Sequence, residues 1–243
     1  MNDTPRDKKP KKEAPKKDPL LIKLIKPKTV NQNKIFKQFN NNHLLIHGTA
    51  GTGKSFVAIY LALDAILNKQ TFSKLIIVRS AVPSRSQGFL PGSEEEKNEI
   101  FELPYIAIVN ELFDNPGAYK YFKNMGIIQF VSTSYLRGLT INDAVVIVDE
   151  VQNLNPGEAS TIITRMGSNI KLILCGDTDQ YDLQYLRQDS CMADLLRIID
   201  LMNSFCIIEM EVADIVRNGI VKEFIIARSK VANNLPNFVR DRR

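Results

Sequence analysis

The segment from His43 to Leu67 constrains this chain more than any other, because three local patterns follow one another there. An apolar run over His43–His47 is typical of a buried strand, and residues 55–67 have the apolar spacing of a helix. Between them lies the pattern G-x-x-x-x-G-K-[ST], formed by Gly48, Thr49, Ala50, Gly51, Thr52, Gly53, Lys54 and Ser55. Strand, loop and helix in this order predict a phosphate-binding loop.

The chemistry of this loop explains the residue types. Glycines allow successive backbone N–H groups to turn toward a polyphosphate, and the N-terminus of the following helix adds positive potential. Lys54 is expected to reach the β- and γ-phosphates, and the Ser55 hydroxyl to hold Mg²⁺. The alternative is a chance glycine-rich turn, which the flanking strand and helix make a poor explanation. The segment therefore predicts a binder of nucleoside triphosphates.

Five further apolar runs predict the rest of a sheet. They are nearly continuous and rich in β-branched residues, as in parallel strands covered on both faces: Leu75–Val78, Ile127–Val131, Val145–Val148, Leu172–Leu174 and Cys206–Met210. With helical stretches between them, they predict an α/β fold of three layers around a mostly parallel sheet, with ligands at the carboxyl ends of the strands. Residues 93–115 interrupt the alternation, and we expect a helical insertion there.

The net charge of +5 is concentrated at one end of the chain. Residues 1–28 hold ten Lys and Arg against four Asp and Glu, a net charge of +6, which leaves −1 for the remaining 215 residues. With Pro5, Pro10, Pro15 and Pro19 among the lysines, this segment predicts a disordered basic tail, suited to nucleic acid or equally to keeping the chain in solution. We expect a domain over residues 29–230 and a short basic tail over 231–243.

Other features of the composition exclude several classes of protein. No run approaches the roughly 20 apolar residues of a membrane span, and the charged N-terminus does not resemble a secretory signal. Three scattered cysteines suit a reducing compartment rather than a disulfide framework. We therefore expect a protein of the cytoplasm.

Two acidic residues end one of the predicted strands. Asp149 and Glu150 follow the apolar run Val145–Val148, as in a Walker B segment. Asp149 is expected to support Mg²⁺, and Glu150 to orient or deprotonate the attacking water. The alternative is an ordinary strand followed by a polar turn, which would have the same sequence pattern. Their position 95 residues after Lys54, on a strand of the same predicted sheet, favours the functional interpretation.

A third strand also ends in polar residues. The sequence Gly176-Asp177-Thr178-Asp179-Gln180 follows the run that ends at Cys175. Its place beside the other two motifs makes Gln180 the candidate for sensing the γ-phosphate or the lytic water. Without those motifs, an Asp-rich turn after a strand would be the preferred explanation.

These motifs together resemble the PhoH family of P-loop ATPases, which is similar to the first RecA-like core of superfamily 1 helicases. The resemblance rests on residues 149–153 and 176–180 and on further stretches between Thr29 and Ala227: residues 79–82, 88–92, 135–138, 142–144, 164–167 and 214–217. It implies ATP hydrolysis coupled to RNA or single-stranded DNA, in the cytoplasm of a bacterium or a phage-infected host. The chain departs from the usual pattern at Ser80 and Val151, and by a longer stretch over residues 115–123 that could alter substrate contacts.

The resemblance also implies roles for single residues. Gln32 matches the position of a glutamine that recognises adenine, although it could simply begin a helix. Arg217 resembles the arginine of the last helicase-like motif and is the candidate for contacting the γ-phosphate, with Arg165 the weaker candidate. Either arginine could instead be an ordinary charge on a surface helix.

Only 33 residues follow Met210, too few for a second RecA-like lobe. We therefore expect a homo-oligomer, a hexameric ring above all, in which a neighbouring subunit completes the ATP site and supplies an arginine. An ATP-gated switch that binds RNA or protein without unwinding is the main alternative function. A small-molecule kinase is less favoured because no arginine-rich lid is apparent, and a nuclease because residues 1–28 are too short for an added nuclease domain.

Overall fold

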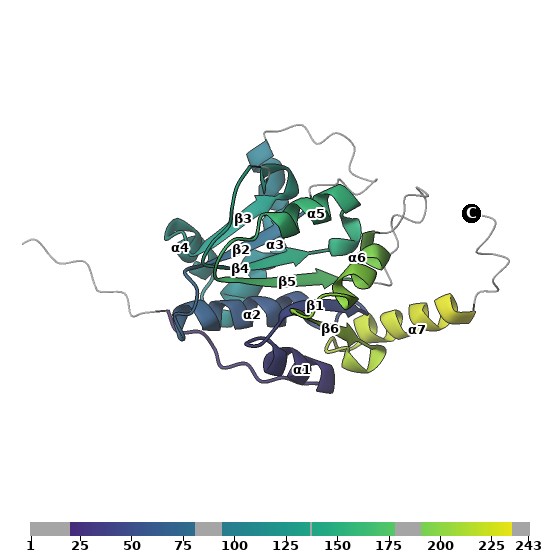
Figure 1. The fold of residues 1–243 in the computed structure, drawn as a ribbon. Coiled ribbons are helices and arrows are strands. Elements are labelled where there is room, and N and C mark those ends of the chain that lie inside the picture. Colours follow the sequence, from purple (N-terminus) through teal and green to yellow (C-terminus); the bar gives the residue numbers. More distant parts are fainter. Residues whose placement is uncertain (1–19, 81–93, 137, 178–190, 235–243) are drawn as a thin grey trace, which may run out of the picture.

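Six strands form one parallel sheet in the order β3-β2-β4-β5-β1-β6 (Figure 1). The computed structural model describes residues 20–80, 94–136, 138–177 and 191–234. The strands coincide with the six apolar runs of the sequence: β1 (His43–Gly48), β2 (Lys74–Arg79), β3 (Ile128–Ser132), β4 (Ala144–Asp149), β5 (Ile170–Gly176) and β6 (Phe205–Met210). The expected α/β fold with a parallel sheet is therefore confirmed.

Helices cover both faces of the sheet, which accounts for the apolar runs. One face packs against α1 (Val30–Gln38), α2 (Lys54–Leu67), α3 (Glu94–Phe113) and α4 (Ala118–Asn124). The other face packs against α5 (Pro156–Thr164) and α6 (Cys191–Asp200). Three short 3₁₀ turns complete the described part: η1 (Thr133–Leu136), η2 (Val151–Asn153) and η4 (Val212–Asp214). Alternate residues of each strand thus enter two separate hydrophobic clusters, one on each face.

The strand order sets the geometry of the site. β1, which leads into the glycine loop, lies between β5 and β6, and β5 separates it from β4. Because the strands are parallel, the loop after β1 and the acidic residues after β4 meet at the same edge of the sheet. The glycine loop and the carboxylates therefore face each other across the end of β5.

The helical insertion expected over residues 93–115 corresponds to α3, and α4 follows it. The longer stretch over residues 115–123 lies mostly in α4, whose Tyr119 and Phe122 are buried. Glu102 of α3 binds both the Lys123 ammonium, at 2.7 Å, and the Tyr119 hydroxyl, at 3.2 Å. In the structure this stretch fastens α4 to α3.

Both expected domain boundaries differ from the structure. Leu20, Ile22 and Ile25 pack against the core of the α1–α4 face, so residues 20–28 belong to the folded part. Within the segment expected as a tail, Lys23 N also donates to the Leu112 carbonyl of α3 at 2.8 Å. At the other end, α7 (Ile220–Asn234) continues past residue 230.

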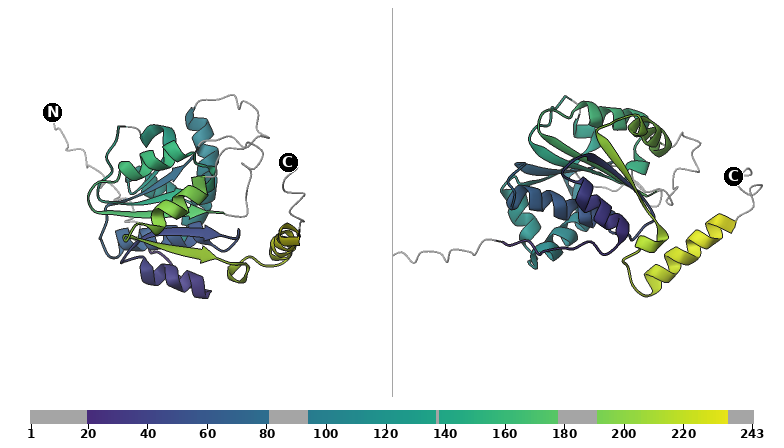
Figure 2. Two further views of the ribbon diagram at one scale, coloured as in Figure 1. Left: turned by 45° about the vertical axis from the view of Figure 1, so that its right-hand side comes forward. Right: turned by 60° about the horizontal axis from the view of Figure 1, so that its bottom comes forward.

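α7 projects from the body of the molecule (Figure 2). Ile220, Val221 and Phe224 expose 81%, 49% and 65% of their surface, so this helix has an apolar face turned to solvent. Among the described residues, no helix has the length and apolar content needed to cross a membrane.

Candidate functional site

The glycine loop has a backbone that only glycine can adopt in places. Gly48 has φ +117°, and a Cβ there would lie 2.1 Å from the Met210 carbonyl oxygen of β6. Gly51 and Gly53 also have positive φ, at +73° and +82°. Gly53 caps α2 without a side-chain acceptor, so the first amides of the helix are directed at the loop. The glycines therefore permit both the curvature of the loop and its close approach to β6.

Three parts of the fold hold this loop from outside. The Gln32 amide of α1 donates to the Thr52 carbonyl at 2.9 Å, and the Met210 carbonyl accepts from Thr49 N at 2.8 Å. Val216, in the segment before α7, donates its N–H to the Gly51 carbonyl at 3.1 Å. The loop is thus preorganised by contacts that leave its inner N–H groups available to a ligand.

Gln32 is buried, and its side chain faces the loop. While its amide donates to Thr52, its carbonyl oxygen accepts from Lys28 N at 2.8 Å. An amide has two N–H groups and two acceptor lone pairs, so one of each remains for a base. The structure therefore gives Gln32 a role that the sequence did not suggest, which is to tie the N-terminal segment to the phosphate loop.

Lys54 lies inside the curve of the loop. Its ammonium donates to the carbonyls of Gly48 and Thr49, both at 2.8 Å. These two hydrogen bonds hold the positive charge of the ammonium against the first two residues of the loop. The arrangement suits a phosphate ligand, because the flexible lysine side chain can move from the carbonyls to a bound phosphate.

Asp149 is held by two hydroxyl groups from different parts of the fold. Its Oδ1 accepts from the Ser55 hydroxyl at 2.9 Å, although the two residues are 94 positions apart. Its Oδ2 accepts from the buried Tyr105 hydroxyl at 3.0 Å. Burial and the charge of Asp149 raise the pKa of Tyr105, which keeps this hydroxyl protonated as a donor. Both oxygens of the carboxylate therefore have fixed directions.

Glu150 has a different environment from its neighbour. Its backbone is left-handed, with φ 56°, and its carboxylate accepts a short hydrogen bond from the Gln152 amide. The Gln152 carbonyl oxygen in turn accepts from Asp177 N at 3.0 Å, so Gln152 connects the ends of β4 and β5. Burial, and next the charge of Asp149, raise the pKa of Glu150, while Gln152 and Arg79 oppose the rise. A carboxylate with a raised pKa suits the abstraction of a proton.

Arg217 lies beside the phosphate loop of its own chain. Its Cγ is 3.1 Å from the position that a Cβ on Gly51 would take, and Ile225 of α7 is equally close. The structure thus brings Arg217 to the site within one subunit, whereas the sequence suggested that an arginine comes from a neighbour.

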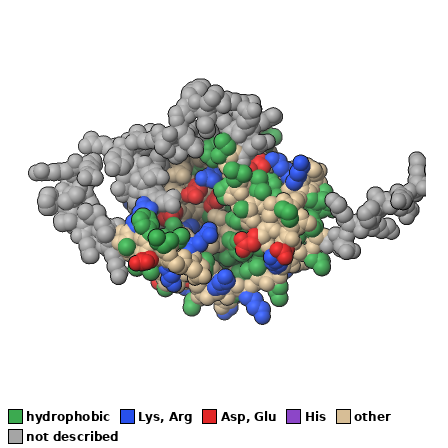
Figure 3. Space-filling view, turned by 180° about the vertical axis from the view of Figure 1, so that it is seen from behind, with side chains coloured by type: hydrophobic (Ala, Val, Ile, Leu, Met, Phe, Trp, Pro, Cys, Tyr) green, Lys and Arg blue, Asp and Glu red, His purple; other side chains and the backbone are tan. Residues whose placement is uncertain are grey.

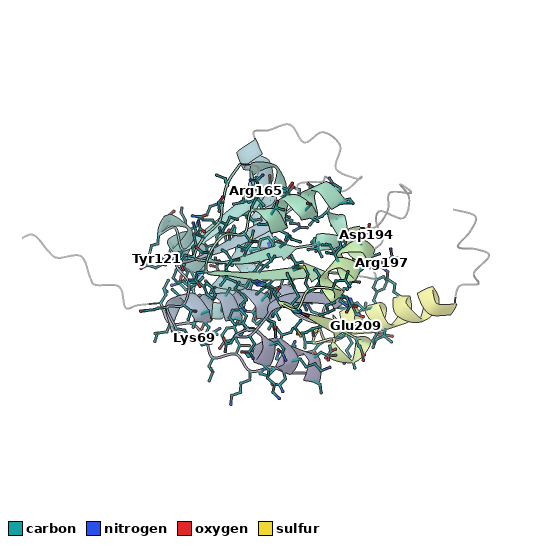
Figure 4. The ribbon with its side chains drawn as sticks, viewed as in Figure 1. Lys69, Tyr121, Arg165, Asp194, Arg197 and Glu209 are labelled. Atoms are coloured by element: carbon teal, nitrogen blue, oxygen red, sulfur yellow. The ribbon has the colours of Figure 1, made fainter. Side chains whose placement is uncertain are left out.

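Arg165 does not join the site. Its carbonyl accepts from Ile141 N, just before the amino end of β4, at the edge of the sheet opposite the glycine loop. Figure 4 shows Arg165 on the α5 side of the sheet, with Lys69, which follows α2, on the other side. Gln180 lies outside the described residues, so its predicted role stays a prediction.

Two residues of the site had no predicted role. Tyr105 lies in the helical insertion, and nothing in its local sequence marks it apart from other aromatic residues of that helix. Gln152 stands two residues after Glu150, within the stretch 149–153 that suggested the family. Its place in that stretch was the only sequence signal that could have pointed to a role in the site. Both act by fixing a carboxylate.

The donor set fits Mg²⁺. Ser55 and Asp149 offer a hydroxyl and a carboxylate oxygen 2.9 Å apart beside the loop, and oxygen ligands are those that Mg²⁺ prefers. Among the described residues there is no cluster of three His, Cys, Asp or Glu side chains that could enclose a metal. A site with few protein ligands is typical of Mg²⁺ carried by a nucleotide.

Comparison with known proteins identifies the family of the chain. A family model described as "PhoH-like protein" matches residues 24–228. A PhoH-like protein of Bacillus subtilis is 33% identical over 212 residues, which cover 86% of this chain and 65% of the relative. One of Mycobacterium leprae is 31% identical over 207 residues, covering 84% and 58%. The chain thus spans about three fifths of the length of these relatives.

Solved structures resemble this fold more remotely. The large terminase of a thermophilic bacteriophage superposes with a TM-score of 0.45 at 12% identity, covering 82% of this chain and 49% of the terminase. The family rests instead on the sequence match, which includes the glycine loop, both carboxylates and the segment with Arg217. The chain therefore belongs to the PhoH-like family, with a P-loop nucleotide-binding fold.

Proposed function

We propose that this protein is a Mg²⁺-dependent ATPase whose hydrolysis is coupled to RNA or single-stranded DNA. The observation that carries the proposal is the 2.9 Å hydrogen bond between Ser55 and Asp149. It joins the end of the phosphate loop to the carboxylate of a second motif across an intervening strand. That arrangement is what Mg²⁺ and a triphosphate require from P-loop proteins.

The phosphates would bind within the loop formed by residues 48–55, with Lys54 moving from the loop carbonyls to the β- and γ-phosphates. Gln32 would contact the adenine through the free part of its amide, which makes ATP preferable to GTP. Mg²⁺, when bound, would neutralise phosphate charge, held by Ser55 and supported by Asp149. Gly48, Gly51 and Gly53 would serve by their backbone.

Glu150 would receive the proton of the attacking water, or orient that water in line with the γ-phosphate. Its raised pKa and its fixed carboxylate support this role. Gln180 would sense the γ-phosphate. Arg217 would stabilise the charge that develops on the γ-phosphate, and the position of its stem beside Gly51 favours action within the same chain.

We propose further that the active form is a homo-oligomer, a hexameric ring above all. The apolar face of α7, with Ile220 and Phe224 exposed, is consistent with such an assembly. Light scattering with ATP and Mg²⁺ should give the mass of a closed ring. A monomer under these conditions would contradict the proposal.

Coupling to nucleic acid rests on the family resemblance, and a specific observation supports the alternative of an ATP-gated switch. The net charge of residues 29–243 is −1, and Figure 3 shows Lys and Arg side chains interspersed with Asp and Glu over the visible face. Strong electrostatic attraction of a nucleic-acid backbone would need Lys and Arg side chains clustered on one surface. The switch would bind its partner only with ATP present and would not unwind a duplex.

Rates of ATP hydrolysis with RNA, single-stranded DNA, duplex DNA and no nucleic acid distinguish the two functions. We expect stimulation by RNA or single-stranded DNA. Stimulation by none of them, together with ATP-dependent binding, would favour the switch. Lys54→Ala should abolish nucleotide binding, which provides the negative control.

A further inference from the structure

The Tyr105 hydroxyl occupies an unexpected position for a residue of an inserted helix. Tyr105 is 1% exposed, and its ring packs 5.8 Å from that of Phe130 in β3. Its hydroxyl nevertheless ends on a carboxylate at the nucleotide site, 44 positions away in the sequence. An ionised carboxylate can only accept, so the tyrosine is the donor.

Because of this hydrogen bond, the two oxygens of Asp149 have different partners. Tyr105 holds Oδ2 from the side of α3, which turns Oδ1 toward the Ser55 hydroxyl. Asp149 is only 8% exposed, so Oδ2 has little access to water if the tyrosine hydroxyl is removed. An anchored Oδ2 therefore determines where Oδ1 points.

We propose that Tyr105 is a positioning residue for the metal-supporting carboxylate, and that its hydroxyl contributes to nucleotide binding only when Mg²⁺ is present. The inference rests on the proposed function, since it requires Mg²⁺ beside Ser55 and Asp149. Residues that orient metal ligands from behind commonly change metal affinity by about 10- to 100-fold when they are altered. α3 is thereby a component of the nucleotide site as well as a cover for the sheet.

The chain offers a matched control. Tyr119 is also a buried tyrosine whose hydroxyl lies 3.2 Å from a carboxylate, that of Glu102, and burial raises its pKa as well. Tyr119→Phe therefore removes the same kind of hydrogen bond between α4 and α3. Glu102 has no contact with the glycine loop or with Asp149 among the interactions of the described residues.

The experiment measures the affinity of the full chain for a fluorescent, non-hydrolysable ATP analogue, once with Mg²⁺ and once with EDTA. The ratio of the two affinities is the gain due to Mg²⁺. In Tyr105→Phe we expect this gain to fall by roughly tenfold or more, with the affinity in EDTA unchanged. Tyr119→Phe should retain the whole gain, even if its melting temperature falls as much.

A second variant keeps the test valid if Tyr105→Phe does not fold. 4-Aminophenylalanine at position 105 retains a weaker donor at the same place, and we expect a gain between those of wild type and Tyr105→Phe. An undiminished gain in whichever variant is folded would overturn the inference while leaving the proposed function intact. Wild-type protein that binds the analogue equally with and without Mg²⁺ would overturn both.

Discussion

Asp149 and Glu150 are adjacent in the sequence, yet the fold holds them in opposite ways. Asp149 ends a regular strand, and two hydroxyl donors fix its oxygens. Glu150 begins a turn with a left-handed backbone, and one amide holds it while burial raises its pKa. A carboxylate that supports a cation needs fixed negative charge, whereas one that accepts a proton needs a raised affinity for it. The difference teaches that environment, not residue type, separates the two roles.

The largest expected effect comes from neutralising each carboxylate in turn. Glu150→Gln should reduce ATP hydrolysis by about 10²- to 10⁴-fold, because the base is lost while the phosphate loop is intact. ATP should remain bound and accumulate on the protein, as equilibrium binding and single-turnover hydrolysis would show.

Asp149→Asn should affect binding instead. We expect the Mg²⁺-dependent part of the nucleotide affinity to fall, because an amide supports the cation poorly. If Glu150→Gln hydrolysed ATP at the wild-type rate, the assignment of the base would be wrong. If both variants behaved alike in binding and hydrolysis, the division of roles would fail.

A smaller effect is expected from Gln152→Leu, which removes the amide that connects Glu150 to Asp177. Loss of one hydrogen bond to a charged group should lower kcat by about 10- to 100-fold, with little change in ATP affinity. Since Gln152 lowers the pKa of Glu150, its removal should raise that pKa further.

The pH profile provides the readout for this variant. A general base acts in its ionised form, so activity is lost as the pH falls through its pKa. A higher pKa in Gln152→Leu should therefore shift the acidic limb of the kcat profile to higher pH. Asn153→Ala, in the same turn, is the control and should leave that limb in place. An unshifted limb in Gln152→Leu would remove Gln152 from the mechanism.

The smallest effect concerns the stability of the protein. Because folding raises the pKa of Glu150, the folded state disfavours its ionised form. Wild-type protein therefore loses stability as the pH rises from the ordinary pKa of glutamate through the raised one. Glu150→Gln lacks this loss.

The difference in the free energy of unfolding between Glu150→Gln and wild type should be smallest in acid and grow to a plateau above the raised pKa of Glu150. Urea unfolding at a series of pH values measures it. Glu111→Gln, at an exposed position of α3, controls for the removal of one charge. A difference that stays constant with pH would mean that burial does not affect Glu150 as described.

The sequence predicted the fold and the chemical groups of the site more fully than their arrangement. All six strands followed from apolar runs, since a strand covered on both faces must be apolar throughout. Ser55, Asp149 and Glu150 could be proposed from the sequence because each stands at the end of a motif. Gln152 lay within such a motif, but the sequence predicted no role for it. Its hydrogen-bond partner Asp177 N follows a different strand, so the contact is not visible in the local sequence. Residues 20–28 were assigned to the tail because of its charge, although five of the six residues from Leu20 to Ile25 are apolar, and Leu20, Ile22 and Ile25 pack against the core.

The sequence by itself determined that a strand, a glycine loop and a helix follow one another, since the requirements of that loop are local. Only the tertiary structure decided which side chains surround the two carboxylates. Tyr105 reaches Asp149 because α3 packs on the same face of the sheet as α2, and Arg217 reaches Gly51 because the segment after β6 returns to the loop. Such contacts depend on how distant elements pack, and no local pattern of residues encodes them.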